Sequence, residues 1–102
     1  MEKLLEPLDP RFRTALLSMY RGEPQLGADG RLHPIDNITK ISPAEGMWLY
    51  DWCVTIKPKA TLEIGMAYGY STLYFLAAIA KNQTGHHTAI DPGQHSDYKG
   101  IG

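Results

Sequence analysis

The sequence predicts an α/β fold built on one strand–helix–strand unit with a parallel sheet and preceded by helices. Three segments predict it. Residues 61–64 (TLEI) and 87–90 (HTAI) are short segments bounded by turn residues, and we interpret them as strands. Between them, residues 71–81 form a longer apolar segment with helical spacing. Two strands joined by a helix form a βαβ unit, whose strands lie parallel in one sheet.

Two further helices are expected before this unit. Asp9 followed by proline predicts a helix over residues 11–20, with Asp9 as the N-cap. Ser42, followed by proline and then by Glu45, has the pattern of a capping box. It predicts a second helix that continues to about residue 56 and ends before Pro58.

The second helix is apolar nearly all round, so we expect it to be largely buried. Its two tryptophans are expected in the core, together with three aromatic residues from the end of the turn and the segment 71–81. These five residues are Trp48, Trp52, Tyr70, Tyr74 and Phe75. Four residues of the later helix fall on one face at helical spacing: Leu73, Leu76, Ala77 and Ala80.

Residues 21–40 are rich in Gly, Pro, Asp and Asn and are expected to form a long loop. We therefore divide the chain into residues 1–40, with a helix and this loop, and residues 41–102, with the βαβ unit. A parallel sheet normally has more than two strands. The sequence stops where a third strand is expected, which indicates a truncated domain or strands supplied by another chain.

Composition excludes several classes of protein. The formal net charge is −1, so no basic excess exists to bind nucleic acid. The longest apolar run, residues 73–80, is too short to span a membrane, and the N-terminus lacks the pattern of a signal peptide. The single cysteine allows no internal disulfide. Together these features favour a cytoplasmic protein.

No metal site is expected. His86 and His87 are adjacent on a predicted strand, so their side chains point to opposite faces. No histidine or cysteine pair has the spacing of a chelating motif. Cys53 lies mid-helix beside tryptophan, where a buried, unreactive thiol is expected.

The turn between the first strand and its helix reads EIGMAYGYS, residues 63–71. Glycine allows a left-handed backbone and close approach of a ligand, and the helix start attracts anions. The dinucleotide fingerprint G-x-G-x-x-G would need glycine where Ala67 and Tyr70 stand. The phosphate-loop motif also fails, because no Lys-Ser or Lys-Thr pair follows the glycines.

The pattern that fits is E-x-G-x-x-x-G-x-S, and with it the chain resembles the class I S-adenosylmethionine-dependent methyltransferases. LEIGMAYGYST is similar to their first motif, and AIDP is similar to the acidic end of their second strand. ISPAEGMWLYDWC, followed by KPKATLEIG, resembles the helix that enters the first strand in small-molecule O-methyltransferases of the catechol and caffeoyl-coenzyme A type. The resemblance covers residues 31–102 and implies the N-terminal part of a Rossmann-like methyltransferase domain.

The resemblance assigns roles in holding S-adenosylmethionine. Gly65 and Gly69 would let its methionine portion lie against the backbone. Glu63 would orient the ammonium group, directly or through water. Ser71 would hydrogen-bond the carboxylate.

Three further cofactor-binding residues follow from the same resemblance. Asp91, at the end of the second strand, would accept both ribose hydroxyls. Ala67 and Tyr68 would line the pocket. The alternative for this segment is a tight turn without a ligand, in which Asp91 is simply a turn former before proline.

The expected function is transfer of a methyl group to a small-molecule acceptor, at oxygen, with this chain carrying the cofactor-binding half. In the resembled family, acceptor-binding, catalytic and metal-binding residues follow later in the sequence. We therefore assign no catalytic residue and no metal, and we expect this chain alone to be inactive.

Two alternatives remain open. A fragment of an NAD-dependent Rossmann oxidoreductase would share the βαβ unit and the acidic residue, although Tyr70 argues against it. A non-catalytic fragment could instead pair with another chain through the exposed edge of the strand 61–64. A homo-oligomer is the partner expected in that case.

Overall fold

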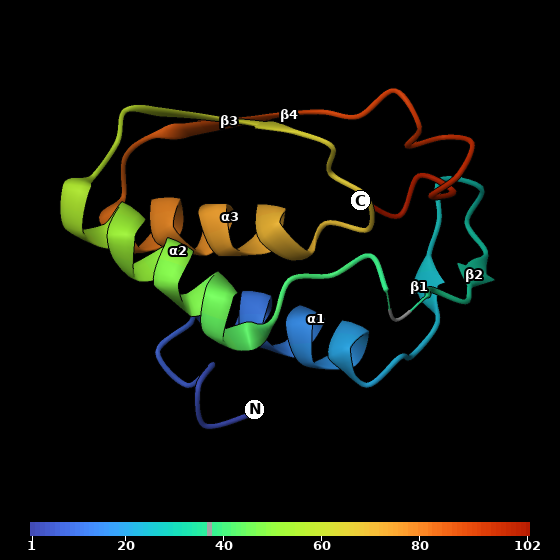
Figure 1. Ribbon diagram of the computed structural model, residues 1–102, viewed down its shortest axis with the longest axis horizontal. Coiled ribbons are helices and arrows are strands. Elements are labelled where there is room, and N and C mark those ends of the chain that lie inside the picture. The colour runs from blue at the N-terminus through green and yellow to red at the C-terminus, as the bar shows by residue number, and fades with distance from the viewer. Residues whose placement is uncertain (37) are drawn as a thin grey trace.

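The computed structural model describes residues 1–36 and 38–102 (Figure 1). Asn37, within the predicted loop, lies outside the described residues. The elements follow in the order α1 (Pro10–Tyr20), β1 (Gln25–Leu26), β2 (Leu32–His33), α2 (Pro43–Ile56), β3 (Ala60–Ile64), α3 (Tyr70–Asn82) and β4 (His86–Ile90). The predicted helices and the predicted βαβ unit, β3–α3–β4, are confirmed.

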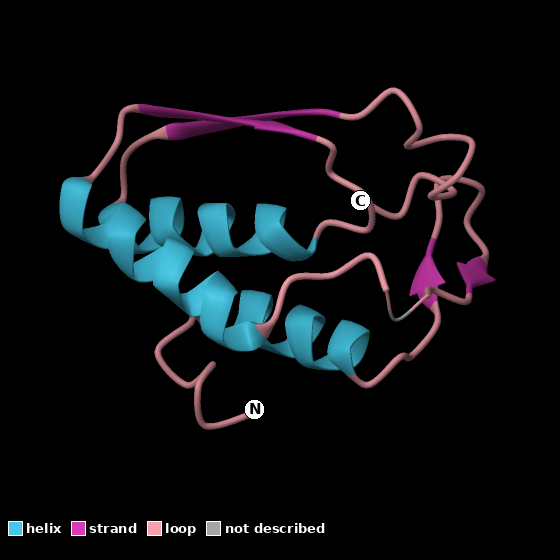
Figure 2. Ribbon diagram, viewed as in Figure 1, coloured by secondary structure: helices cyan, strands magenta, loops and turns pink. Residues whose placement is uncertain are grey.

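The βαβ unit forms a two-stranded parallel sheet. β3 and β4 pair from Ala60 opposite His86 to Ile64 opposite Ile90. The helices lie on one side of this sheet, with α3 beneath it and α2 beside α3 (Figure 2). The α/β class is therefore as predicted, and the arrangement is that of a partial Rossmann-like fold.

The caps of α1 and α2 are also as predicted. The Asp9 carboxylate accepts the Arg11 amide at 2.9 Å. At the start of α2 the Ser42 hydroxyl accepts the Glu45 amide, and the Glu45 carboxylate accepts the Ser42 amide, each at 3.1 Å. This reciprocal pair satisfies two backbone donors that a helix start otherwise leaves unpaired.

The core lies where α1, α2 and α3 meet. Its most deeply buried large side chains are Tyr74 of α3, Leu16 of α1, and Leu5 and Leu8 of the N-terminal turns. The Tyr74 hydroxyl lies 2.9 Å from the Tyr20 hydroxyl, which donates to the Ile41 carbonyl at 2.9 Å. These hydrogen bonds let two tyrosines occupy the core without unpaired hydroxyls.

The prediction that α2 is largely buried is wrong for one of its faces. Trp48, Trp52 and Ile56 are 62 %, 51 % and 56 % exposed. α2 packs on its neighbours through the opposite face, which carries Gly46, Met47, Tyr50 and Cys53. No described element covers the tryptophan face, so the two indole rings contact each other, with centroids 5.3 Å apart.

The buried face of α3 also differs from the expected one. Tyr70, Tyr74, Ala77 and Ala78 are buried, whereas Leu76 is 37 % exposed. The two aromatic residues are in the core as predicted, and Phe75 is partly buried against it. The spacing predicted a single inward face, but α3 is apolar on several sides, and contact with α1 and α2 buries a different one.

Residues 21–40 are not wholly a loop, because β1 and β2 form a short antiparallel hairpin. Strands of two residues are too short to show any hydrophobic alternation in the sequence. The hairpin is joined to the C-terminal segment by a hydrogen bond of 2.9 Å from the Ala28 amide to the Lys99 carbonyl. This hydrogen bond places the β1–β2 hairpin, within residues 1–40, beside the last ten residues of the sequence.

Among the described residues, no helix has both the length and the apolar character needed to cross a membrane.

Candidate functional site

The candidate site lies at the carboxyl edge of the β3–β4 sheet. β3 leads into the glycine turn, residues 65–69, and β4 leads directly into Asp91. The Gly65 amide donates to the Ile90 carbonyl at 2.8 Å, which continues the pairing of the strands by one residue. The Ala67 amide then donates to the Asp91 carboxylate at 2.7 Å. The first motif and the acidic strand end, distant in sequence, are therefore in direct contact.

The turn has three residues with left-handed backbone. Gly65, Ala67 and Gly69 have φ of +85°, +52° and +98°. A Cβ at Gly65 would meet nothing within 4 Å, so a ligand can approach the backbone there. Ala67 adopts a conformation that is costly for a residue with a side chain. Its hydrogen bond to Asp91 offsets part of that cost.

Asp91 keeps capacity for a ligand. One carboxylate oxygen accepts the Ala67 amide, and the other accepts the Gly93 amide at 3.0 Å. An ionised carboxylate offers about four lone-pair sites. The side-chain amide of Gln94 also donates, at 3.4 Å, to the oxygen that accepts the Ala67 amide. These three donors orient the carboxylate and leave the remaining acceptor capacity for a ligand hydroxyl.

The start of α3 differs from the starts of the other two long helices. Its N-cap is Gly69, and no side chain caps the first turn. The amides at a helix start carry a partial positive charge and lack partners within the helix. Uncapped, they form a site suited to a carboxylate or a phosphate.

Glu63 and Ser71 are brought together, but they contact each other. The Glu63 carboxylate accepts hydrogen bonds from the hydroxyls of Ser71 and Thr72. It also lies 3.4 Å from the Nε2 atom of His87. The Glu63 side chain is 9 % exposed and faces α3, so its carboxylate lies beneath the turn.

Tyr68 is buried, and its hydroxyl donates to the Asp36 carboxylate at 3.3 Å. Burial raises the pKa of this phenol, with Asp36 beside it. The ring meets that of Tyr98 edge-on, at 5.1 Å between centroids. Tyr68 thus links the glycine turn to the segment before α2 and to the C-terminal segment.

Three hollows lie at the turn or at the start of α3. One of about 270 Å³ is lined by residues that include Met66, Tyr68 and Gly69 of the turn and Gly102. A second, of about 230 Å³, is lined by Thr39, Lys40, Ile41, Gly65, Met66, Ala67, Tyr70 and Ser71.

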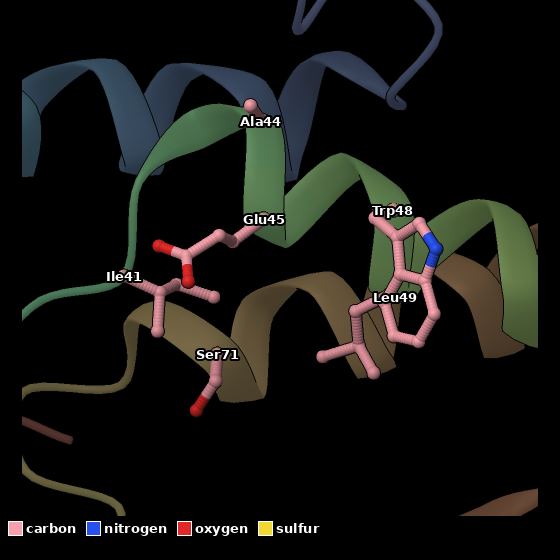
Figure 3. A pocket seen from close by; sticks show the side chains of 6 residues that line it. All are labelled: Ile41, Ala44, Glu45, Trp48, Leu49 and Ser71. Atoms are coloured by element: carbon pink, nitrogen blue, oxygen red, sulfur yellow. The ribbon is translucent and has the colours of Figure 1, made fainter.

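The third hollow, of about 510 Å³, is apolar and lies between the starts of α2 and α3 (Figure 3). It is lined by Ile41, Ala44, Glu45, Trp48, Leu49 and Ser71, so Ile41 and Ser71 border both this hollow and the one beside Gly65.

No cofactor-binding residue was predicted among residues 39–41. The resemblance indicated only that the loop 31–40, just before the capped helix, lies over the cofactor or the acceptor. In the structure Thr39, Lys40 and Ile41 lie opposite the glycine turn and form the far wall of the hollow beside Gly65.

The C-terminal segment covers the Ala67 side of the turn. Gln94 is 9 % exposed, and its side-chain amide donates to the Ala67 carbonyl at 2.6 Å. The Gly102 amide donates to the Gln94 side-chain oxygen at 2.6 Å. A Cβ at Gly69 would lie 3.5 Å from Gly102, so these residues pack directly on the turn.

Over residues 1–36 and 38–102, no group of three or more His, Cys, Asp or Glu side chains could hold a metal ion. His86 and His87 lie on opposite faces of β4, as predicted, with His86 exposed and the His87 side chain 2 % exposed. Cys53 is buried as predicted, and burial raises the pKa of its thiol.

A family model described as a methyltransferase domain matches residues 62–100, which is less than half of the chain. The match includes the glycine turn, α3, β4 and Asp91. No curated protein and no solved structure is significantly similar to this chain. The match supports a methyltransferase domain in this part of the chain, and methyltransferase activity as its general class.

Proposed function

We propose that this chain carries the cofactor-binding half of an S-adenosylmethionine-dependent methyltransferase that acts on a small molecule at oxygen. The observation that carries the proposal is the contact of Asp91 with Ala67, 2.7 Å from carboxylate to amide. It joins an acidic strand end to a glycine turn at the edge of a parallel sheet, where ligands of such sheets bind. Both residues fall within the segment that matches the methyltransferase domain.

The residues present fit the cofactor. The uncapped amides of α3 would hold its carboxylate, and Gly65 leaves room for its methionine portion. The Ser71 hydroxyl, expected from the sequence to bind this carboxylate, donates its one hydrogen to Glu63 instead and is not counted among the donors. Glu63 would orient the ammonium group through water, because its own carboxylate is held beneath the turn.

The nucleoside portion has its own partners. Asp91 would accept the ribose hydroxyls with the acceptor capacity that the Ala67, Gly93 and Gln94 donors leave free. Ala67 and Tyr68 would line the pocket beside it.

The cofactor supplies a methyl group bound to a sulfonium, and transfer to an acceptor oxygen is a direct displacement. Such a step is accelerated mainly by holding the two reactants in line. The part of this chain is to bind and orient one reactant. The small-molecule class of the acceptor, and oxygen as its methylated atom, rest on the resemblance of residues 41–64 to small-molecule O-methyltransferases.

Calorimetric titration with S-adenosylhomocysteine, with NAD as a parallel control, tests the proposal. Saturable binding of S-adenosylhomocysteine alone is expected. Asp91→Ala should abolish this binding, whereas Asp51→Ala, an exposed aspartate on α2, should not change it.

A second pair of variants distinguishes the effect of backbone strain on binding from the effect of blocking the site. Gly65→Val and Gly30→Val both place a side chain at a left-handed position in open space, with φ of +85° and +79°. Only Gly65→Val should abolish binding. Binding of NAD instead of S-adenosylhomocysteine, or unchanged affinity in Asp91→Ala and Gly65→Val, would contradict the proposal.

A second candidate function is self-association through the sheet. The face of the sheet directed away from α3 carries Leu62, Ile64 and Ile90, which are 60 %, 76 % and 50 % exposed. Each strand of this sheet pairs on one side only among the described residues. An apolar face with free edges favours pairing with a second copy of the chain.

Sedimentation analysis at several concentrations tests this candidate. A dimer that Ile64→Lys dissociates, and that Thr55→Lys on α2 does not, would support it. A monomer at every concentration would exclude it.

A further inference from the structure

The inward face of the β3–β4 sheet is mostly polar. Thr61 and Glu63 of β3 and His87 of β4 point toward α3 together with the small Ala89, while the large apolar residues Leu62, Ile64 and Ile90 point away. Strands of a parallel sheet are usually apolar on the face that packs on a helix. Polar side chains at such a position are retained only if they are hydrogen-bonded.

The three side chains form one network under the glycine turn. The Nδ1 atom of His87 lies 2.7 Å from the Thr61 hydroxyl, and its Nε2 atom lies 3.4 Å from the Glu63 carboxylate. The imidazole stacks on the ring of Phe75, 4.6 Å between centroids and 19° between planes. The side chains of His87 and Glu63 are 2 % and 9 % exposed, so this contact is nearly dry.

The position of the proton follows from the partners. An ionised carboxylate only accepts hydrogen bonds, so Nε2 of His87 must carry the hydrogen that faces Glu63. Nδ1 then either accepts the Thr61 hydroxyl or, in the imidazolium, donates to it. Both forms hold the ring in the same place.

Glu63 connects His87 to the first turn of α3. Its carboxylate accepts the hydroxyls of Ser71 and Thr72, which are the second and third residues of the helix. Helices α1 and α2 are fastened by side chains that bind their N-terminal amides. The first turn of helix α3 is instead held by the hydroxyls of Ser71 and Thr72, which donate to Glu63 of the underlying strand. Its N-terminal amides therefore remain available to bind a ligand.

We propose that His87 is a positioning residue for the candidate cofactor site. By donating to Glu63, it holds that carboxylate under α3 and so fixes the uncapped amides that receive the carboxylate of the ligand. A buried carboxylate that loses a hydrogen-bond donor must recover it by movement or by water. Loss of His87 therefore loosens the helix start. The ligand in this proposal rests on the proposed function, while the effect on the helix start does not.

The test compares His87→Leu with His86→Leu, which alters the exposed neighbour on the same strand. His87→Leu should weaken binding of S-adenosylhomocysteine by about tenfold to a hundredfold, the range for loss of one hydrogen bond to a buried charge. His86→Leu should leave it unchanged. His87→Gln, whose side-chain amide can still donate to Glu63, should restore most of the affinity.

Two measurements without ligand separate this proposal from the proposed function. Amide hydrogen exchange at residues 73–76, which carry the first hydrogen-bonded amides of α3, should speed up in His87→Leu and stay unchanged in His86→Leu. The nitrogen resonances of the His87 ring should show a protonated Nε2, and the chemical shift of this nitrogen should change in Glu63→Gln. Because Glu63→Gln retains His87, it provides a test even if His87→Leu does not fold.

If the unaltered chain does not bind S-adenosylhomocysteine but the exchange and nitrogen shifts behave as expected, the proposed function fails and the positioning role stands. Equal exchange at residues 73–76 in both leucine variants, or an Nε2 without a proton, would overturn the positioning role.

Discussion

The amide of Ala67 donates a hydrogen bond of 2.7 Å to the carboxylate of Asp91 across the ends of β3 and β4. The same carboxylate accepts the amide of Gly93. One side chain therefore holds the left-handed backbone at Ala67 and the turn after β4. Asp91 therefore stabilises the backbone of both turns, in addition to its proposed contact with ribose.

We expect Asp91→Asn to destabilise the protein, because the amide that replaces one oxygen places a donor against a donor. Loss of one charge-assisted hydrogen bond costs about 1.5–3 kcal/mol. Urea denaturation measures the change, with Asp51→Asn on the exposed side of α2 as the control. Equal midpoints in both variants would show that the contact with Ala67 contributes nothing to stability.

Gly46→Ala should destabilise the protein even though alanine favours helices by about 1 kcal/mol. A Cβ at Gly46 would lie 2.2 Å from ring atoms of Tyr74, which is fully buried and cannot retreat. Overpacking of this kind costs about 1–3 kcal/mol or more, so it outweighs the propensity. Thermal unfolding of Gly46→Ala beside Ala44→Gly, at an exposed position of the same helix, checks this. A higher melting temperature for Gly46→Ala would contradict the packing described.

The two tyrosine hydroxyls in the core should not be equivalent. Tyr74→Phe removes only the hydrogen bond to Tyr20 and should cost about 1 kcal/mol. Tyr20→Phe leaves both the Tyr74 hydroxyl and the Ile41 carbonyl without their partner, so it should cost more, about 2–3 kcal/mol. Denaturation midpoints of the two variants give the order. The reverse order would mean that Tyr74 finds another partner.

Stability should fall on acidification in part through Glu45. Its hydrogen bonds with Ser42 hold the pKa of this carboxyl below its ordinary value of 4.5. A lowered pKa in the folded state means that the stabilisation is present above about pH 4.5 and is lost as the pH falls through the lower, folded value. Glu45→Gln should therefore flatten the acid side of the stability profile, measured by urea midpoints between pH 3 and 7. Glu23→Gln, outside the capping box, serves as the control, and identical profiles for the two variants would contradict this.

Much of the fold follows from local sequence. The Asp-Pro and Ser-Pro starts of α1 and α2, the end of α2 before Pro58, and the turn after β4 each depend on side chains within a few residues of the backbone they bind. The same holds for the glycine turn, whose left-handed positions require small residues. Local chemistry of this kind can be read without knowledge of the tertiary structure.

The candidate site could be predicted only in part. The glycine turn and Asp91 were identified from motifs, and the structure joins them. The wall formed by residues 39–41 and the cover provided by Gln94 carried no motif, because their place depends on how distant segments pack. The contacts of the Glu63 carboxylate with Ser71, Thr72 and His87 could likewise not be predicted from residue spacing.

The sequence by itself determined the three helices, the βαβ order and the residues of the turn, since these depend on contacts between near neighbours. Only the tertiary structure decided that β1 and β2 pair, that Trp48 and Trp52 face solvent, and that His87 lies buried under the glycine turn. An apolar helix has several possible inward faces, and a strand has two. The choice between them is made by the surface that each element packs on, which no local pattern specifies.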